Sequence, residues 1–159
     1  MKQSPHSSLP RIPFTKDAYE KMRIDVSRLN RDREETLERL KVAREQGDLS
    51  ENGAYRYAKM ELGNIGRQLR QLHYLLRFGH VVQSSEKTNV VGFGNTVTLS
   101  TNGKEVSYMI VSEHEADPKN GKLSTESPIG KALLGKKIGD TVVVSAPARE
   151  LNYTITKIT

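Results

Sequence analysis

Two long segments of the chain carry apolar residues at alternating steps of three and four, the spacing of a helix that packs against one partner helix. The second segment shows this spacing without a break, whereas the first has Arg33 where an apolar residue is expected. The apolar positions are Tyr19, Met22, Val26, Leu29, Leu37 and Leu40 in the first segment, and Tyr55, Ala58, Leu62, Ile65, Leu69, Leu72 and Leu76 in the second. A short link containing Gly47 separates the segments, so each is the simplest partner of the other. We therefore predict an antiparallel coiled-coil hairpin over residues 15–78.

The predicted hairpin is long for a chain of 159 residues. An arm of about 28 residues extends roughly 40 Å at the rise of an α-helix. Such a rod cannot wrap around a common core with the rest of the chain, so we expect two domains. A projecting rod is suited to reaching into a partner.

From Val90 onward the pattern changes to short runs of β-branched and aromatic residues, which favour strands. The predicted strands cover 97–99, 106–111, 141–144 and 153–158, and they are bounded by Asn102-Gly103, Asn120-Gly121 and Gly139-Asp140. A short helix is predicted between them, with Ser127 as N-cap, Pro128 at its first position and Gly135 just past its end. This half therefore predicts a small α+β domain, an antiparallel sheet with a helix on one face.

The fold class expected for the whole chain is α+β, with four parts. Residues 1–13 form a flexible tail, 14–79 the coiled-coil hairpin with its acidic tip, 80–89 a linker, and 90–159 the sheet domain. The tail and the linker are assigned from their Ser-rich, polar composition.

The composition limits the compartment. The sequence contains no cysteine, which excludes disulfides and thiolate metal sites and fits a reducing compartment. No apolar run approaches the roughly 18 residues of a membrane span, and the first residues lack the apolar core of a signal peptide. We therefore expect a cytoplasmic protein with no membrane contact.

The positive charge is concentrated in the first half. The net charge of the chain is +6; residues 1–82 contain 16 Lys and Arg against 11 Asp and Glu, and residues 83–159 contain 9 against 8. A basic rod favours an anionic partner, either nucleic acid or an acidic protein surface. The alternative is a solvated coiled-coil exterior in which acids alternate with the bases. Few aromatic residues lie among the bases, so stacking on single-stranded nucleic acid is not supported.

The sequence has no P-loop, no GxSxG and no HExxH motif, and its four histidines lack metal-ligand spacing. Gly92-Phe93-Gly94 has no helix after it, so it predicts a turn at the start of a strand and not a phosphate loop. Glu113, Glu115 and Asp117 are either a cation site or solvated loop acids.

The turn between the two helical segments carries two carboxylates, Asp48 and Glu51. Their spacing of three is that of a capping box, with Asp48 as N-cap and Glu51 closing the first turn. Alternatively, one or both acids coordinate a divalent metal. Mg²⁺ takes about six oxygen ligands and often only one or two carboxylates, so two acids at an exposed tip make an incomplete site. If a partner already holds one metal and a phosphodiester, the two acids could help to bind a second metal and orient the attacking water.

The turn from Gly47 to Tyr55, preceded by Ala43-Arg44-Glu45, closely resembles the coiled-coil tip of the bacterial Gre transcript-cleavage factors, the GreA/GreB family. The second half resembles the second domain of these factors in the motifs Val91-Gly92-Phe93-Gly94, Glu115-Ala116-Asp117 and Ser127 to Lys137. The resemblance covers about residues 12–158, and the motifs occur in the family's order.

This resemblance implies a function. Family members bind RNA polymerase through an FKBP-like C-terminal domain and insert the coiled coil through the secondary channel. There the tip acids help to hold a second Mg²⁺ and promote hydrolysis of nascent RNA in backtracked complexes. Asp48 and Glu51 match these acids, and Asn52 and Tyr55 complete the tip motif. The protein is then not itself an enzyme and has no cofactor of its own, because the Mg²⁺ is shared with the polymerase active site.

The resemblance also places basic residues near the tip. Arg44 and Lys59 match basic positions at which contact with the 3′ segment of the nascent RNA or with the channel is expected, and Arg56 adds to this patch. Contact with DNA would arise only through the polymerase complex. A monomer is expected.

One position departs from the family pattern: Ala54 stands where relatives usually carry an acid, so this tip has two carboxylates where many have three. Ala54 does not remove the pair expected to act on the metal, so cleavage stimulation stays the favoured function. Two alternatives stay open: a secondary-channel regulator that does not promote cleavage, and a basic coiled coil that binds nucleic acid directly. The C-terminal domain also admits a prolyl isomerase, but its few aromatic residues favour a binding module. The segment from Ser127 to Lys137 is either its polymerase surface or ordinary core. GreA-like and GreB-like features occur together, so the subfamily stays open.

Overall fold

The computed structural model describes residues 11–46, 52–83, 89–146 and 149–159. Contacts within the chain define two compact units, one containing Tyr19–Gly79 and the other combining Ile12–Ala18 with His80–Thr159. In the described part of the chain, no helix is both long enough and apolar enough to cross a membrane.

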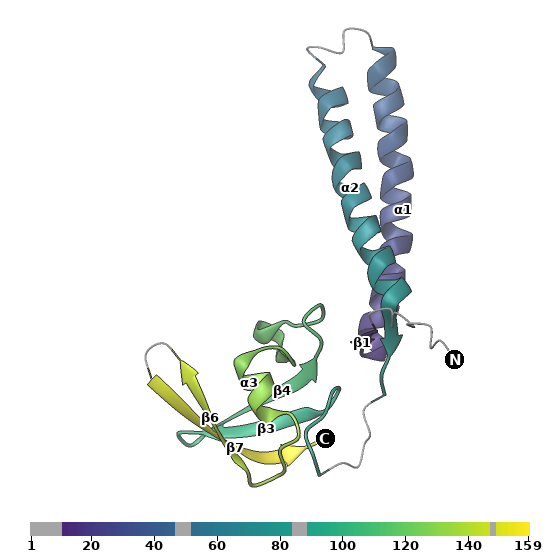
Figure 1. The fold of residues 1–159 in the computed structure, drawn as a ribbon. Helices are drawn as coiled ribbons and strands as arrows, with labels where there is room; N and C mark the ends of the chain where they lie inside the picture. Colours follow the sequence, from purple (N-terminus) through teal and green to yellow (C-terminus); the bar gives the residue numbers. More distant parts are fainter. Residues whose placement is uncertain (1–10, 47–51, 84–88, 147–148) are drawn as a thin grey trace, which may run out of the picture. The chain divides into compact units, whose positions relative to one another are not determined.

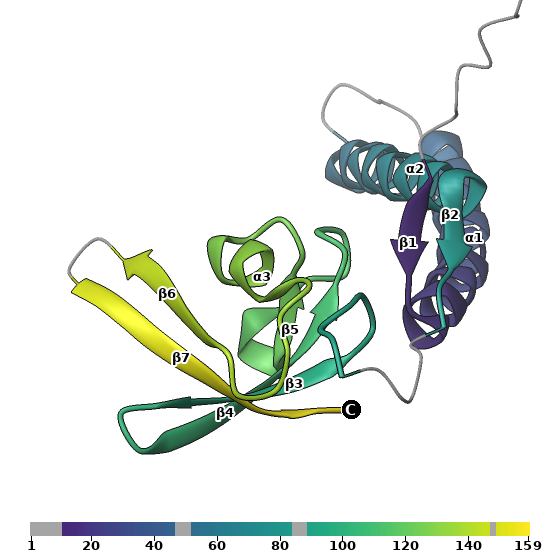
Figure 2. The same cartoon turned by 60° about the horizontal axis from the view of Figure 1, so that its bottom comes forward.

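The first unit is a helical hairpin, as the heptad spacing predicts. Its helices α1 (Lys16–Glu45) and α2 (Gly53–Phe78) lie side by side and run antiparallel (Figures 1 and 2). The hydroxyl of Tyr19, near the start of α1, donates to the carbonyl of Leu76, near the end of α2, at 3.2 Å. The two helices are therefore also connected by a hydrogen bond at the end opposite the turn.

The buried residues of the hairpin form one narrow seam. Those of α1 are Met22, Leu29, Thr36 and Ala43, and those of α2 are Ala58, Ile65, Leu69 and Leu75. The α1 residues recur every seven positions, which is the heptad repeat of a two-helix coiled coil. Leu29, Ile65 and Leu69 form the apolar centre, with Val26 and Leu72 packed against it.

The seam of α1 differs from the prediction at one heptad. Leu37, predicted to be buried, is 45% exposed, and Thr36 is fully buried in its place. The hydroxyl of Thr36 donates to the carbonyl of Asp32 at 2.7 Å and accepts from Arg39 Nη2 at 2.8 Å. Because the hydroxyl has partners, burying it carries little penalty. A threonine therefore fits a position where the sequence favoured leucine.

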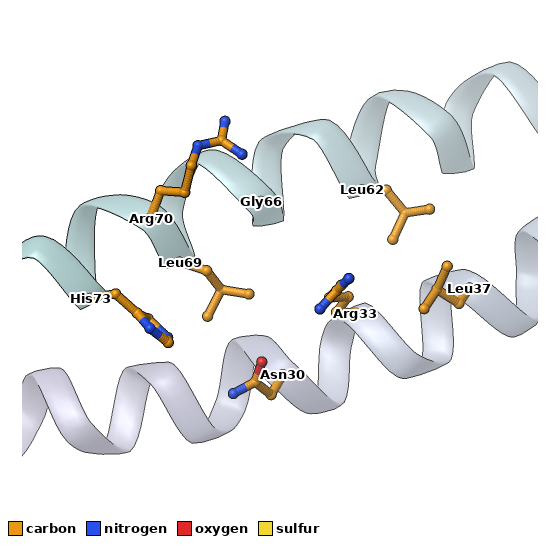
Figure 3. A pocket seen from close by; sticks show the side chains of 8 residues that line it. All are labelled: Asn30, Arg33, Leu37, Leu62, Gly66, Leu69, Arg70 and His73. Atoms are coloured by element: carbon orange, nitrogen blue, oxygen red, sulfur yellow. The ribbon is translucent and has the colours of Figure 1, made fainter.

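Arg33 interrupts the apolar seam, as the sequence indicates. It lies on α1 facing α2, opposite the stretch of α2 between Leu62 and Leu69 (Figure 3). The residue stays exposed and is not enclosed in the seam. The hairpin is therefore packed less completely around Arg33 than around the apolar centre formed by Leu29, Ile65 and Leu69.

Two short strands, β1 (Ile12–Phe14) and β2 (Gly79–Val81), pair with each other. The sequence pattern does not predict them. Val82 N donates to Phe14 O at 2.9 Å, which extends the pairing. Phe14 is almost fully buried and its ring lies 6.3 Å from that of His114. The segment before α1 thus packs within the C-terminal unit.

The C-terminal unit contains a five-stranded sheet in the order β5-β4-β3-β7-β6. Its strands are β3 (Thr96–Thr101), β4 (Lys104–Val111), β5 (Lys122–Ser124), β6 (Thr141–Ala146) and β7 (Arg149–Ile158). All four long strands match predicted strands and pair antiparallel, while the short β5, which was not predicted, runs parallel to β4. Asn102 and Gly103, both at positive φ, form the two-residue turn between β3 and β4.

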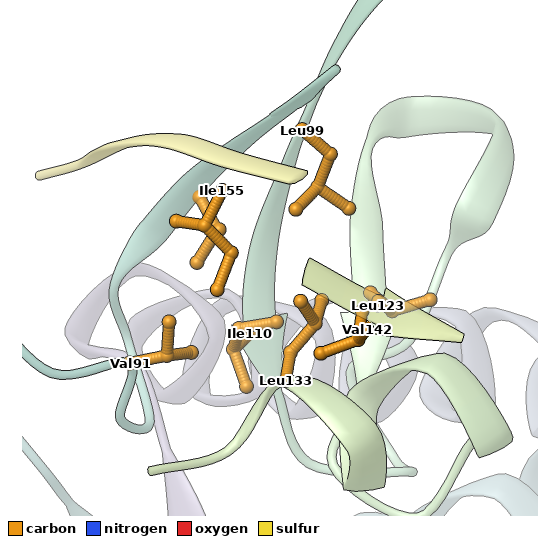
Figure 4. Close-up of a cluster of buried hydrophobic side chains, with 8 residues drawn as sticks. Val91, Leu99, Ile110, Leu123, Leu133, Val142 and Ile155 are labelled. Carbon is orange, nitrogen blue, oxygen red and sulfur yellow. The ribbon is translucent and has the colours of Figure 1, made fainter. Parts of the chain in front are cut away.

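One face of this sheet is covered by the short helix α3 (Pro128–Leu133) (Figure 2). The core between them consists of Val91, Val97, Leu99, Ile110, Leu123, Leu133, Val142 and Ile155 (Figure 4). Tyr108 and Tyr153 pack against this cluster. These tyrosines therefore contribute to the core of the unit.

The limits of α3 follow the prediction. Ser127 is the N-cap: its Oγ accepts from Gly130 N at 3.0 Å and donates to the carbonyl of Ser124 at 2.7 Å. Gly135, just past the helix, has φ 76°. At Gly130 a Cβ would lie 2.0 Å from the carbonyl oxygen of Ser124, so only glycine fits there.

Candidate functional site

The end of the hairpin is held by the side chain of Asn52, the N-cap of α2. Its Oδ1 accepts from Tyr55 N at 3.1 Å, and its Nδ2 donates to the carbonyl of Ala43 in the last turns of α1 at 2.7 Å. One amide therefore caps α2 and connects it to α1. An acid in this place could accept the first hydrogen bond but could not donate the second.

This geometry corrects the capping-box prediction. The sequence placed Asp48 at the N-cap of the second helix, with Glu51 closing its first turn, but the N-cap is Asn52. Asp48 and Glu51 themselves lie outside the described residues. Since Asn52 supplies the cap, starting α2 does not require Asp48.

Small residues let the helices approach each other closely near this end. Ala43 on α1 and Ala58 on α2 are both buried. Tyr55 is half-buried at the first position of the predicted α2 seam. The Arg39 guanidinium pairs with the Glu61 carboxylate across the helices, Nη2 to Oε2 at 2.9 Å. Packing, a cap and an ion pair thus fix the helix ends that carry the tip.

The three predicted RNA-binding residues are exposed on these helix ends. Arg44 lies in the last turn of α1, and Arg56 and Lys59 lie in the first two turns of α2. Among the described residues, none of the three forms an ion pair, in contrast to Arg39. All three side chains are therefore exposed on the helix ends next to the tip.

Ala54 is exposed in the first turn of α2, which contains no acid. It lines a mainly apolar groove of about 520 Å³ together with Val42 and Tyr57. Val42 and Tyr57 are both exposed. The periodic pattern does not predict this groove, because it marks only residues of the seam and neither Val42 nor Tyr57 belongs to it.

The loop acids of the C-terminal unit do not form the cation site that was considered for them. The Glu115 side chain is only 4% exposed, and Lys122 Nζ lies 3.1 Å from its Oε1. It also accepts hydrogen bonds from Thr15 N at 3.1 Å and Thr15 Oγ1 at 2.6 Å. Glu113 faces His114. In the described part of the chain, no three His, Asp or Glu side chains are grouped as metal ligands would be.

The segment from Ser127 to Lys137 contributes to the core and also to the surface. Leu133 is fully buried, and Ile129 packs against the core cluster. Leu134, in contrast, is exposed, as is Ile138 just beyond the segment. The core interpretation therefore holds for Ile129 and Leu133 but not for Leu134.

The chain combines a long helical hairpin with a small α+β domain. Residues 12–81 match the family described as transcription elongation factor, N-terminal, and residues 86–159 match the family described as transcription elongation factor, GreA/GreB, C-term. The chain belongs to the GreA/GreB family of transcription elongation factors.

Similar proteins carry the same description. The chain is 42% identical over 147 residues to transcription elongation factor GreA of Thermosipho melanesiensis, covering 91% of this chain and 94% of that protein. It is 40% identical over 150 residues to GreA of Bacillus subtilis, covering 92% and 96%. Among solved structures, the GreA factor homolog 1 (Gfh1) of Thermus thermophilus is 26% identical, with coverage of 94% and 99% and a TM-score of 0.45.

Proposed function

We propose that this protein is a transcription elongation factor that stimulates RNA cleavage by RNA polymerase in backtracked or arrested complexes. The hairpin enters the secondary channel and brings Asp48 and Glu51 to the polymerase active site. The observation that carries this proposal is the cap: Asn52 starts α2 and connects it to α1, so the two acids are not needed to start α2. Membership of the GreA/GreB family supports it.

The chemistry assigned to the acids is that of an incomplete site. Carboxylate oxygens are the ligands that Mg²⁺ prefers, and two of them leave room for phosphate and water. When bound, a second Mg²⁺ stabilises charge on the phosphodiester and activates the attacking water. Asp48 and Glu51 would bind the ion and orient that water, and the bond is cleaved in the polymerase's own site. The protein is thus a cofactor of RNA hydrolysis and not an enzyme by itself.

Arg44, Arg56 and Lys59 would bind the 3′ segment of the nascent RNA. All three are exposed near the tip and have no ion-pair partner among the described residues. Phosphate contacts by exposed bases position a strand without reading its sequence. These residues would therefore hold the RNA next to the acids.

A second candidate function is regulation of the polymerase without cleavage. Ala54 favours it, because the first turn of α2 carries an exposed methyl group where relatives usually have an acid. If two carboxylates bind the shared Mg²⁺ too weakly, the hairpin would occupy the secondary channel without promoting RNA cleavage.

The test uses a backtracked RNA polymerase elongation complex in Mg²⁺, with cleavage of the RNA 3′ end followed over time. The wild-type protein is compared with Asp48→Asn/Glu51→Gln, which keeps shape and removes charge. Faster cleavage that disappears in the variant, with polymerase binding unchanged, supports the proposal. Binding without faster cleavage by the wild type supports the second candidate.

A further inference from the structure

An open groove of about 560 Å³ lies on the surface of the hairpin between the middle turns of α1 and α2. Figure 3 shows Leu62 and Leu69 pointing from α2 toward α1, with Gly66 between them and Arg33 on the facing helix. The groove does not include the start of α2, next to the tip: its lining residues on α2 begin at Leu62, in the third turn of the helix.

The groove exists because two seam-side positions lack an apolar side chain. Arg33 occupies a heptad position but stays exposed, and Gly66 opposite has no side chain. A Cβ at Gly66 would meet only Arg70 Nη1, at 3.6 Å, so the space above it is open. Leu37, exposed and apolar, lines the groove on the α1 side. Leu37 and the half-buried Leu62 thus leave some apolar surface accessible between the helices, while Leu69 beneath them is buried.

The rim of this groove is cationic. Arg33 and Arg70 line it together with Asn30 and His73, and no acid does. In the described part of the chain, neither Arg33 nor Arg70 has an acidic side chain within ion-pair distance, whereas Arg28 and Arg39 do. Two unpaired guanidinium groups beside the exposed Leu37 and the half-buried Leu62 favour a partner that is both acidic and apolar.

The spacing of the lining residues fits a helix. They recur on α1 at 30, 33 and 37, and on α2 at 62, 66, 69 and 73, which are steps of three and four. A third helix packed between α1 and α2 would meet one residue of each stripe per turn. The α2 stripe extends for roughly 16 Å, about three turns of such a helix.

We propose that this groove binds an amphipathic helix of a protein partner, with an apolar side chain over Gly66 and carboxylates against Arg33 and Arg70. Docking of a helix in an apolar groove is a common mode of peptide recognition. Single-stranded RNA fits less well, because leucines form the floor and no Phe, Tyr or Trp lines it for base stacking. The proposal goes beyond cleavage stimulation, since it does not involve Asp48 or Glu51.

The test measures binding of a synthetic helical peptide of about 20 residues, long enough to span the groove. This peptide carries Leu along one helical face and Glu beside the Leu positions. A second peptide, used for comparison, has Lys in place of every Glu. Fluorescence anisotropy with the full-length protein is expected to show saturable binding of the Glu peptide only. Gly66→Leu fills the groove and should weaken binding about tenfold, the effect of losing roughly 1.4 kcal/mol.

Gly63→Leu is the matched control, because Gly63 lies one turn earlier on α2, outside the groove, and its Cβ would also meet only an arginine side chain. Circular dichroism verifies that both variants keep their helices. Arg33→Glu/Arg70→Glu should reverse the preference toward the Lys peptide. The proposal is overturned if the Glu peptide shows no saturable binding, if both glycine variants weaken it equally, or if an RNA oligonucleotide binds this groove in its place.

Discussion

The side-chain amide of Asn52 connects the two helices of the hairpin, with Nδ2 donating to the Ala43 carbonyl at 2.7 Å while Oδ1 caps α2 through Tyr55 N at 3.1 Å. The residue that starts one helix thus also donates to a carbonyl in the last turn of the other, where backbone carbonyls lack an intrahelical partner. These two bonds join the described chain on either side of Asp48 and Glu51, which lie between Ala43 and Asn52 in the sequence.

Replacing Asn52 should destabilise the hairpin. Asn52→Ala removes both bonds and is expected to cost about 2 kcal/mol, the sum of a helix cap and a second hydrogen bond. Asn52→Asp keeps the cap but loses the donor to Ala43, so its cost should be smaller. Urea unfolding followed by the helical signal measures both, with the exposed Gln68→Ala as control. Equal costs for the two variants would contradict the bridging role.

Arg33→Leu should stabilise the hairpin by about 1 kcal/mol, because a leucine at this heptad position buries apolar area against α2. Arg31→Leu, an exposed change outside the seam, should give no gain. Thermal unfolding compares the two proteins. If the groove opposite Arg33 is too wide for a leucine to reach α2, the two variants will behave alike and the packing argument fails.

Much of the fold could be predicted because it is set by local residues. Ser127 and Gly135 mark the two ends of α3, and Asn102-Gly103 forms the turn between β3 and β4. Each feature depends on the conformation and hydrogen bonds of a few neighbouring residues. What the sequence missed depends on contacts between distant residues. β1 forms only because β2, more than sixty residues later, pairs with it, and a three-residue strand containing a proline has no period of its own.

The errors at the candidate site have equally specific causes. Thr36 and Leu37 lie three and four residues after Arg33, so both fit the three-or-four spacing. Hydrophobicity favours Leu37, but Thr36 is the buried residue because its hydroxyl has hydrogen-bond partners. Asp48 and Asn52 are both good caps, and only the carbonyl of Ala43 across the hairpin, which requires a donor, favours Asn52. The roles of the tip acids stay predictions from the family resemblance.

Glu115→Gln should destabilise the C-terminal unit. The Glu115 carboxylate is nearly fully buried, pairs with Lys122 and accepts hydrogen bonds from the backbone N–H and the hydroxyl of Thr15. Losing its charge therefore leaves the Lys122 ammonium without its counter-ion. Because Lys122 is about one-third exposed, the expected cost is about 1–3 kcal/mol, below that of a fully buried pair. Glu113→Gln, at an exposed neighbouring acid, should change little. Chemical unfolding measures both, and equal costs would show that the pairing of Glu115 is unimportant.

Gly130→Ala should destabilise the same unit severely, by about 3 kcal/mol or more. The new methyl group would lie 2.0 Å from the backbone oxygen of Ser124, which cannot move without breaking the cap of α3. Gly63→Ala is the opposite case: it meets only a flexible arginine at 3.8 Å and should stabilise α2 by up to about 1 kcal/mol. Melting temperatures of the two proteins test this contrast, which fails if both shift in the same direction.

Ala54→Glu should increase cleavage stimulation, because it adds a carboxylate to the first turn of α2, which has none. The gain is expected at limiting Mg²⁺ and should vanish when the ion is in excess, since a third carboxylate acts on the affinity for the shared metal. The side chain is exposed, so the change causes no overlap, and a negative charge at a helix N-terminus adds about 0.3–1 kcal/mol of stability. Ala54→Gln controls for size. A Mg²⁺ titration of RNA cleavage in a backtracked complex decides the matter: equal titration curves for the Glu and Gln variants would mean that the acid absent from this tip does not tune metal binding.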